Sequence, residues 1–287
     1  MSNSLSFSSS PLNKIIGTKY YDLESTLTVM KNLWTFSIIQ GFEFQHLAEW
    51  NRNYPPKDKD PRYDRYEAWK DSKKYTIEEI AKILNDVKIP ILSIHGNRDI
   101  GILCCSDNPD DIEDAKKLIL DAVNLAELVG AKICVFHLWD TSDEKFDPVI
   151  QKEIIDSIAI SFPKIRLSIE NIPTSLKNYT PFDLVENFNW ITLDLRWAAL
   201  YDELNKFSIL REKIVNVHIR GTLEGTEWKL KNAPFTIYEA LDTIINKWNY
   251  KGIFTFEPEG KLSGATWDDL VKAINSIKKV VSASILE

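Results

Sequence analysis

Short runs dominated by apolar residues recur along the chain, and seven of them end directly in a histidine or a carboxylate. The runs are four or five residues long and rich in β-branched and aromatic side chains, as buried strands are. A weaker run of the same kind spans Ser4 to Ser9, so the pattern predicts eight strands. The seven stronger runs end at His46, His95, His137, Glu170, Asp194, His218 and Glu257.

Runs with helical spacing lie between these strands. From Ile112 to Ala126, apolar residues recur three and four positions apart and form one stripe that can cover the outside of a sheet. Gly130 and Gly252 stand where left-handed helix C-caps are expected. Helix starts are marked by capping boxes or by a cap before proline, at Thr76, Asn108, Asp147, Thr236 and Thr266. The alternation predicts an α/β fold, a single (β/α)8 TIM barrel formed by residues 1–287 as one domain.

The longest irregular stretch runs from about residue 50 to residue 74, after the second strand, and carries an excess of basic over acidic side chains. Long loops inside compact domains are uncommon and often serve as lids or contact surfaces. We therefore expect this charged loop to cover the site or to form an oligomer contact. A solvated mixed-charge loop is the alternative.

Composition narrows the class of function. The net charge of −7 and the isoelectric point near 5.3 argue against a surface that grips nucleic acid through its phosphates. No segment approaches the roughly 18 uninterrupted apolar residues that a membrane span needs. The N-terminal residues do not read as a secretion signal and the three cysteines do not read as a disulfide framework, so we expect a cytoplasmic protein with a small-molecule substrate.

Four of the terminal residues, Glu170, Asp194, His218 and Glu257, end four consecutive predicted strands. In a closed barrel those ends converge on one rim. Three carboxylates crowded into a dry pocket repel one another and take up protons unless a cation offsets them. The pattern therefore predicts one bound divalent metal ion, and Mn²⁺, Mg²⁺, Co²⁺ and Zn²⁺ all stay open.

The same segments resemble the metal-site motifs of a known superfamily. They are Ser168-Ile169-Glu170-Asn171, Thr192-Leu193-Asp194, Val217-His218-Ile219 and Phe256-Glu257-Pro258. In this order they are similar to the motifs of the xylose-isomerase-like barrels, which include sugar isomerases, ketose 3-epimerases and zinc apurinic-site endonucleases. The resemblance covers essentially the whole chain.

The resemblance implies that these four residues bind one metal and that Glu170 and Glu257 are also the catalytic acid and base. A metal that holds a substrate carbonyl and its neighbouring hydroxyl stabilises the enediolate formed when the adjacent carbon loses a proton. Return of the proton to the opposite face is epimerisation, and return to the neighbouring carbon is aldose–ketose isomerisation. Relatives in this superfamily are often dimers or tetramers, but the chain itself offers no decisive interface signal.

Further residues are candidates for substrate binding. His95 and His137 would bind sugar oxygens in an isomerase and additional zinc ions in an endonuclease, and His46 is as easily a structural histidine. Arg220 could receive a phosphate or carboxylate of the substrate, or pair with Glu224 or Glu259. The tryptophans that follow strands could stack on sugar faces, and these are Trp139 and Trp197 together with Trp50 and Trp228.

Departures from the superfamily pattern leave three functions open. Trp197 stands where a histidine commonly follows the strand-six aspartate, and Thr226-Glu227-Trp228 offers no Asp-x-His pair for a three-metal cluster. The first function is a metal-dependent isomerase or epimerase of a sugar, polyol or sugar phosphate. The second is a phosphodiesterase resembling the apurinic-site endonucleases, which the acidic charge and the missing ligands disfavour. The third is a barrel that binds a sugar without turnover.

Overall fold

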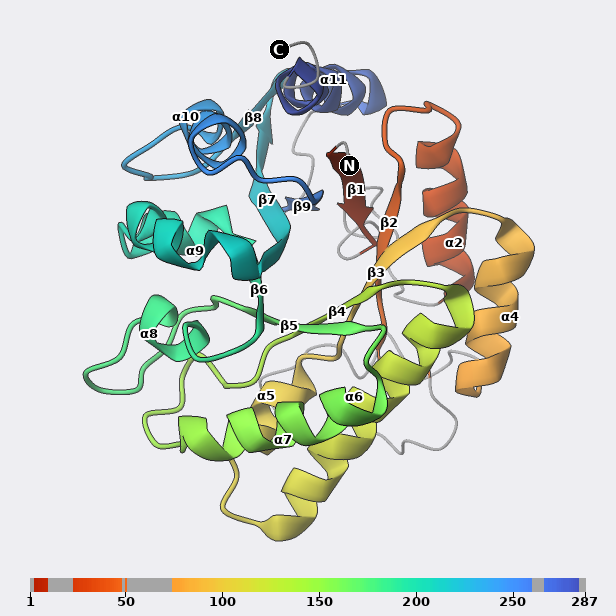
Figure 1. Cartoon of the computed structure of the whole chain (residues 1–287). Coiled ribbons are helices and arrows are strands. Elements are labelled where there is room, and N and C mark those ends of the chain that lie inside the picture. The colour runs from red at the N-terminus through yellow and green to blue at the C-terminus, as the bar shows by residue number, and fades with distance from the viewer. Residues whose placement is uncertain (1–2, 10–22, 48–49, 51–73, 260–265, 284–287) are drawn as a thin grey trace.

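The computed structural model describes residues 3–9, 23–47, 50, 74–259 and 266–283. Within these ranges eight parallel strands pair in the order β1, β2, β3, β4, β5, β6, β7 and β9, and β9 pairs with β1 to close a barrel. A short strand, β8, pairs antiparallel with the end of β7. The helices surround the strands on the outside (Figure 1). The predicted (β/α)8 barrel is confirmed, and the weak first run is one of its strands.

The barrel strands are β1 (Ser4–Ser8), β2 (Gly41–Gln45), β3 (Ile91–His95), β4 (Ile133–Phe136), β5 (Arg166–Glu170), β6 (Trp190–Asp194), β7 (Ile214–Glu224) and β9 (Ile253–Pro258), and β8 is Glu227–Lys229. The α-helices are α2 (Leu23–Trp34), α4 (Ile77–Val87), α5 (Asp99–Cys104), α6 (Pro109–Val129), α7 (Pro148–Ser161), α8 (Pro181–Val185), α9 (Leu195–Leu200), α10 (Ile237–Asp242) and α11 (Trp267–Ala283). A 3-10 segment, η2 (Leu204–Lys213), precedes β7, and a π-helical segment, η3 (Thr243–Lys247), continues α10. The predicted loop at 50–74 lies outside the described residues except for its two ends.

Most of the expected helix boundaries are present. The caps are confirmed, with side-chain bonds at Thr76, Asn108, Asp147, Thr236 and Thr266. Gly130 is left-handed at φ 79°, as predicted. The prediction for Gly252 was wrong, because Asn249 takes the left-handed conformation before β9 at φ 54°. Gly252 is needed for a different reason: a Cβ there would lie 2.3 Å from the Tyr250 hydroxyl.

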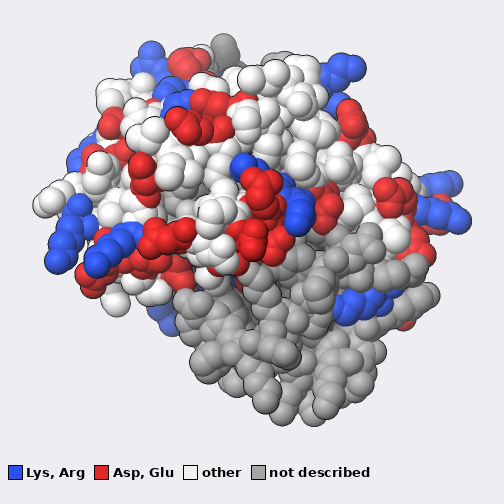
Figure 2. Space-filling view, turned by 90° about the horizontal axis from the view of Figure 1, so that it is seen from below, with Lys and Arg blue, Asp and Glu red and all other residues white. Residues whose placement is uncertain are grey.

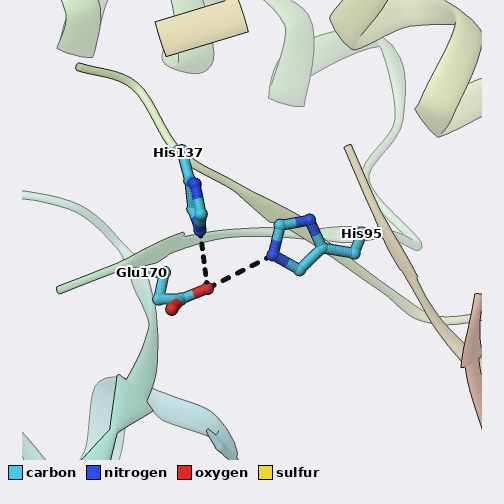
Figure 3. A group of neighbouring side chains, drawn as sticks. All are labelled: His95, His137 and Glu170. Carbon is cyan, nitrogen blue, oxygen red and sulfur yellow. Dashed lines mark hydrogen bonds and ion pairs between the residues drawn. The ribbon is translucent and has the colours of Figure 1, made fainter. Parts of the chain in front are cut away.

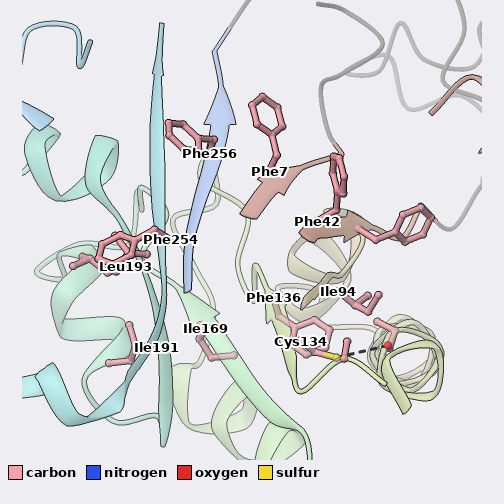
Figure 4. Close-up of a cluster of buried hydrophobic side chains, with 14 of the residues drawn as sticks. Phe7, Phe42, Ile94, Cys134, Phe136, Ile169, Ile191, Leu193, Phe254 and Phe256 are labelled. Carbon is pink, nitrogen blue, oxygen red and sulfur yellow. Dashed lines mark hydrogen bonds between the residues drawn. The ribbon is translucent and has the colours of Figure 1, made fainter. Parts of the chain in front are cut away.

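The outer face of the barrel strands is apolar and packs under the helices. Phe42, Cys134, Ile191 and Phe254 are buried on this face, as Figure 4 shows. The Cys134 thiol lies 3.6 Å from the Ala122 carbonyl of α6, which fixes the outward direction of that side chain. Burial of this layer supplies the main stabilisation of the barrel against unfolding.

The inner face of the same strands is mostly polar above a small apolar base. Ile133, Val135 and Val215 form that base. The next layer is hydrogen-bonded across the lumen, since Asn216 on β7 donates to Glu43 on β2 although these strands are not neighbours. One step further along, at the carboxyl rim, lie the terminal histidines and carboxylates other than His46, which is on the outer face. Because side chains alternate between the two faces of each strand, the apolar core residues lie on the outer face and the candidate site residues lie on the inner face.

The surface carries charges of both signs. On the face drawn in Figure 2, acidic groups lie beside lysines and arginines, and no continuous basic stripe crosses the described residues in that view. Among the described helices none is long and apolar enough to cross a bilayer.

Candidate functional site

The carboxyl rim of the barrel brings together four of the residues that the sequence singles out. Glu170 and Asp194 are the last residues of β5 and β6, while His218 lies within β7 and Glu257 within β9. Each offers a ligand atom, and the four atoms all lie within 4.8 Å of one another. His218 Nδ1 is 3.3 Å from Glu170 Oε2 and 3.2 Å from Glu257 Oε2. The predicted cluster is therefore assembled.

A second group shares Glu170 with the first. His137 Nε2 lies 3.0 Å and His95 Nε2 lies 3.3 Å from the same Glu170 oxygen, Oε2 (Figure 3). The two imidazoles meet edge to face with centroids 4.9 Å apart. Their ligand atoms and that of Glu170 also lie within 4.8 Å of one another. Glu170 thus stands at the junction of both groups.

Arg220 reaches into the carboxylate cluster from β7. Its Nε donates to Asp194 Oδ2 at 2.6 Å, and its Nη2 donates to Glu170 Oε1 at 3.3 Å and lies 2.9 Å from Glu257 Oε2. Pairing with Glu224 or Glu259 was one of the two expected alternatives for Arg220, but Glu224 pairs with Lys229 and Glu259 with Arg196. The reason is position along the strand: Arg220 is two residues beyond His218 on the same inward face and pairs in register with Glu257 of β9, whereas Glu224 lies at the hairpin with β8.

Glu43 is a part of this site that the sequence analysis missed. It is fully buried in β2, accepts hydrogen bonds from Ser93 at 2.8 Å and Asn216 at 2.9 Å, and lies 3.1 Å from His218 Nε2. This contact leaves Nδ1 as the ring nitrogen that faces Glu170 and Glu257. The detectable signal was a carboxylate at an alternating position between Phe42 and Phe44.

The charges of the site shift one another's pKa values. Burial opposes ionisation of Glu170, yet His137 and His218 outweigh it and hold its pKa well below the usual value. Burial likewise opposes a charge on His218, but Glu43 and Glu170 raise its pKa well above the usual value. Burial raises the pKa of Asp194 to about 7 against the pull of Arg220, with Glu170 and Glu257 adding to the rise.

The chemistry of the donor set fits a divalent metal ion. Three carboxylates and one imidazole form an oxygen-rich set of the kind that Mn²⁺, Mg²⁺, Co²⁺ and Zn²⁺ accept. His218 Nδ1 is buried and makes no hydrogen bond, although it points at two carboxylates. A buried nitrogen aimed at acids without a hydrogen bond is what a metal ligand looks like before coordination.

A cavity of about 370 Å³ opens over the cluster. This volume lies within the range of small-ligand sites, roughly 300 to 1,000 Å³. Of the predicted site residues, those that line it are His95, His137, Trp197, Arg220 and Glu257.

Other predicted residues lie elsewhere. Trp139 is 1% exposed and stacks on Phe146, and its indole N–H donates to the Pro173 carbonyl. Trp50 and Trp228 are also buried, and none of these three tryptophans lines the cavity. They pack as core side chains, so the expectation that they wall the pocket was wrong. His46 is fully buried, and neither of its ring nitrogens makes a hydrogen bond to the described residues.

Comparison with known proteins agrees on the fold. No protein-family model matches the sequence, and no curated protein matches it. Among solved structures, an L-ribulose 3-epimerase superposes with a TM-score of 0.64 at 15% identity, covering 99% of this chain and 96% of that one. A D-allulose 3-epimerase from Methylomonas sp. gives 0.65 at 12% identity, over 97% and 98%. A sugar phosphate isomerase/epimerase from Parabacteroides distasonis gives 0.64 at 12% identity, over 96% and 93%.

Proposed function

We propose that this chain is a divalent-metal-dependent isomerase or epimerase of a sugar, polyol or sugar phosphate. The observation that carries the proposal is the convergence of Glu170, Asp194, His218 and Glu257 on one rim, beneath a cavity of sugar-sized volume. The likeness in fold to sugar epimerases and to a sugar phosphate isomerase/epimerase supports the same class.

In the proposed reaction the four residues of the cluster hold the metal. The ion, when bound, polarises a substrate carbonyl and the neighbouring hydroxyl and so makes the adjacent C–H more acidic. The protein supplies the proton transfers through Glu170 and Glu257.

The two glutamates differ in access. Glu257 lines the cavity and its side chain is 13% exposed, whereas Glu170 is fully buried behind His95 and His137. Burial disfavours the charge on Glu257, but Arg220 and His218 lower its pKa, so the carboxylate is ionised at neutral pH. We assign Glu257 as the group that removes the proton and Glu170 as its partner acid and base.

The remaining cavity residues fit substrate binding. Trp197 offers an indole at the cavity wall, suited to stacking on a sugar face. His95 and His137 offer imidazoles beside it, and His137 is the more exposed of the two. Burial lowers the pKa of His137, which favours a neutral ring that can exchange hydrogen bonds with hydroxyl groups.

One observation favours a second candidate, a two-metal phosphodiesterase. The group formed by His95, His137 and Glu170 is a second possible ligand set that shares a carboxylate with the first. Two metals held in this way are a common arrangement in phosphoester hydrolysis. Against it stand the negative net charge and Trp197 in place of a further histidine.

The proposal is tested with purified protein stripped of metal and reloaded with Mn²⁺, Mg²⁺, Co²⁺ or Zn²⁺. Elemental analysis counts ions per chain, and mass spectrometry in D₂O screens ketoses, aldoses and their phosphates for carbon-bound deuterium. One ion per chain and deuterium in a substrate would support the isomerase or epimerase. Two ions with cleavage of abasic DNA would support the phosphodiesterase, and sugar binding without exchange would support a non-catalytic barrel.

A further inference from the structure

Two of the residues singled out as candidates for substrate binding, Arg220 and Trp197, contact each other. Arg220 follows the strand-seven histidine by two residues, and Trp197 replaces the common strand-six histidine. The Arg220 guanidinium carbon lies 5.1 Å from the centre of the Trp197 ring. A cation held over an indole at this distance is attracted to its face. Trp197 therefore helps to hold Arg220 over the carboxylates.

Asp194 shows why the position of Arg220 matters. Its Oδ1 accepts the backbone N–H groups of Arg196 and Trp197 and so caps α9. Its other oxygen, Oδ2, accepts the 2.6 Å bond from Arg220. Both carboxylate oxygens are thus engaged. The oxygen that does not cap the helix is the natural one to offer to a metal.

The Arg220 guanidinium also contacts Glu257 and Glu170. Arg220 Nη2 lies 2.9 Å from Glu257 Oε2, the oxygen that also faces His218 Nδ1, and 3.3 Å from Glu170 Oε1. The Arg220 side chain is 17% exposed and lies between the cluster and the cavity. One cationic group therefore contacts all three carboxylates of the candidate metal site.

We propose that Arg220 is an internal competitor for the metal. In the metal-free protein its single positive charge partly offsets the charges of Glu170, Asp194 and Glu257, and a dication binds only as the guanidinium withdraws from Asp194 and Glu257. The chain thereby sets its own metal affinity. This inference rests on the metal site of the proposed function, but not on the identity of the substrate.

Calorimetric titration of metal-free protein with Mn²⁺ tests the competition. Arg220→Met keeps the aliphatic stem against Trp197 and removes the guanidinium. In this variant no guanidinium has to leave the carboxylates before the metal binds. We therefore expect the Mn²⁺ affinity to rise by about 5- to 150-fold, the range typical of coupled binding. Arg220→Lys retains the positive charge but loses the planar guanidinium, so its Mn²⁺ affinity should lie between those of the unmodified protein and Arg220→Met.

Arg196→Met is the matched control. Arg196 also lies near the Trp197 ring, at 6.0 Å, but its side chain pairs with Glu259 and the Lys231 carbonyl rather than with the three carboxylates. Loss of a nearby positive charge alone would strengthen metal binding in both variants. Competition for the oxygens strengthens it only in Arg220→Met. Equal gains in the two variants, or unchanged or weaker binding in Arg220→Met, would overturn the proposal.

A second measurement uses the unmodified protein and does not depend on how the variants fold. The Arg220 Nε–H, hydrogen-bonded to Asp194, gives a ¹⁵N–¹H resonance that can be followed during titration with Zn²⁺. We expect this signal to move or exchange rapidly at saturation, and an unchanged signal would refute withdrawal. If the protein exchanges sugar protons but these tests fail, only the competition by Arg220 is refuted. If these tests succeed but no sugar proton exchanges, only the proposed function is refuted.

Discussion

His218 and His46 are both fully buried histidines at the carboxyl side of barrel strands, yet their surroundings are opposite. His218 points into the lumen, where Glu43, Glu170 and Glu257 surround it. His46 continues the alternation of Phe42 and Phe44 on the outer face of β2, and within the part of the chain that the structure describes neither ring nitrogen makes a hydrogen bond. Burial disfavours a charge on both. The acids nonetheless raise the pKa of His218 well above its usual value, and nothing opposes the fall of the His46 pKa to about 4.

The difference shows that strand phase, more than position along the strand, decides what a terminal residue does. A shift of one residue along a strand moves a side chain from the polar lumen, where charged groups stabilise each other, to the apolar outer face, where only neutral side chains are tolerated. Substitutions in the lumen should therefore change metal binding and catalysis. Substitutions on the outer face should change stability.

The largest expected effect comes from Glu257→Gln on the lumen side. Because this variant removes the proposed base and keeps the shape, we expect deuterium exchange into substrate to fall about 100- to 10,000-fold, as loss of a general base does. Mass spectrometry in D₂O measures the rate, and thermal unfolding verifies the fold. Glu259→Gln is the matched control, since Glu259 also lines the cavity but pairs with Arg196. Equal losses in both variants would remove Glu257 from the role of base.

The outer face is tested by Phe42→Ala. Phe42 is fully buried under the helices, so its truncation leaves a cavity and should lower the free energy of unfolding by about 3 to 5 kcal/mol. Denaturant unfolding of the metal-free protein measures the loss. Mn²⁺ affinity of the folded fraction should stay at the unmodified value. A large loss of affinity with little loss of stability would contradict the separation of the two faces.

His46 adds a pH dependence with a defined sign. Its pKa is about 4 in the folded chain against a usual 6.5, so between these values the unfolded chain binds more protons. The contribution of neutral His46 to stability is therefore complete above pH 6.5 and is lost as the pH falls toward 4, by about 3 kcal/mol in total.

Unfolding free energies of the unmodified protein and of His46→Leu, measured from pH 7 to pH 4, isolate this contribution. The variant lacks the titrating group, so the difference between the two curves should change by the same amount across this window. Phe44→Leu, on the same face of β2, carries no titrating group and should run parallel to the unmodified protein. Parallel curves for His46→Leu would show that His46 does not titrate as its burial requires.

Much of the fold was predictable from sequence because its signals are local. Strand runs, capping boxes and the apolar stripe of α6 each depend on residues a few positions apart, and all were confirmed. The convergence of Glu170, Asp194, His218 and Glu257 was also predictable, since barrel closure fixes where strand ends meet. Gly252 was misread because Asn can take the left-handed position as well as Gly.

The rest of the site depends on contacts across the lumen that no local pattern encodes. Arg220 has three acidic partners on three other strands, and the nearest acids in sequence are not among them. The tryptophans could not be divided between core and cavity without the backbone that carries them. Glu43 was the exception that strand alternation alone could have revealed, because it lies between the outward-facing Phe42 and Phe44 and therefore faces the lumen, in register with Ser93 on β3.

Glu43→Gln tests the two faces of one strand at adjacent positions, since Glu43 and Phe42 are neighbours in sequence on opposite faces of β2. Glu43 holds Nε2 of His218 so that Nδ1 faces the cluster. Residues that orient a metal-binding histidine in this way typically contribute about 10- to 100-fold to metal affinity, and we expect a loss of that size for Mn²⁺. Thr192→Val, which breaks only the hydroxyl bond to Ser168 in the same polar layer, is the control and should bind Mn²⁺ as the unmodified protein does. If Glu43→Gln left the affinity intact, the buried carboxylate would serve the packing of the lumen alone, and the division between a functional lumen and a structural shell would begin one layer higher, at the rim.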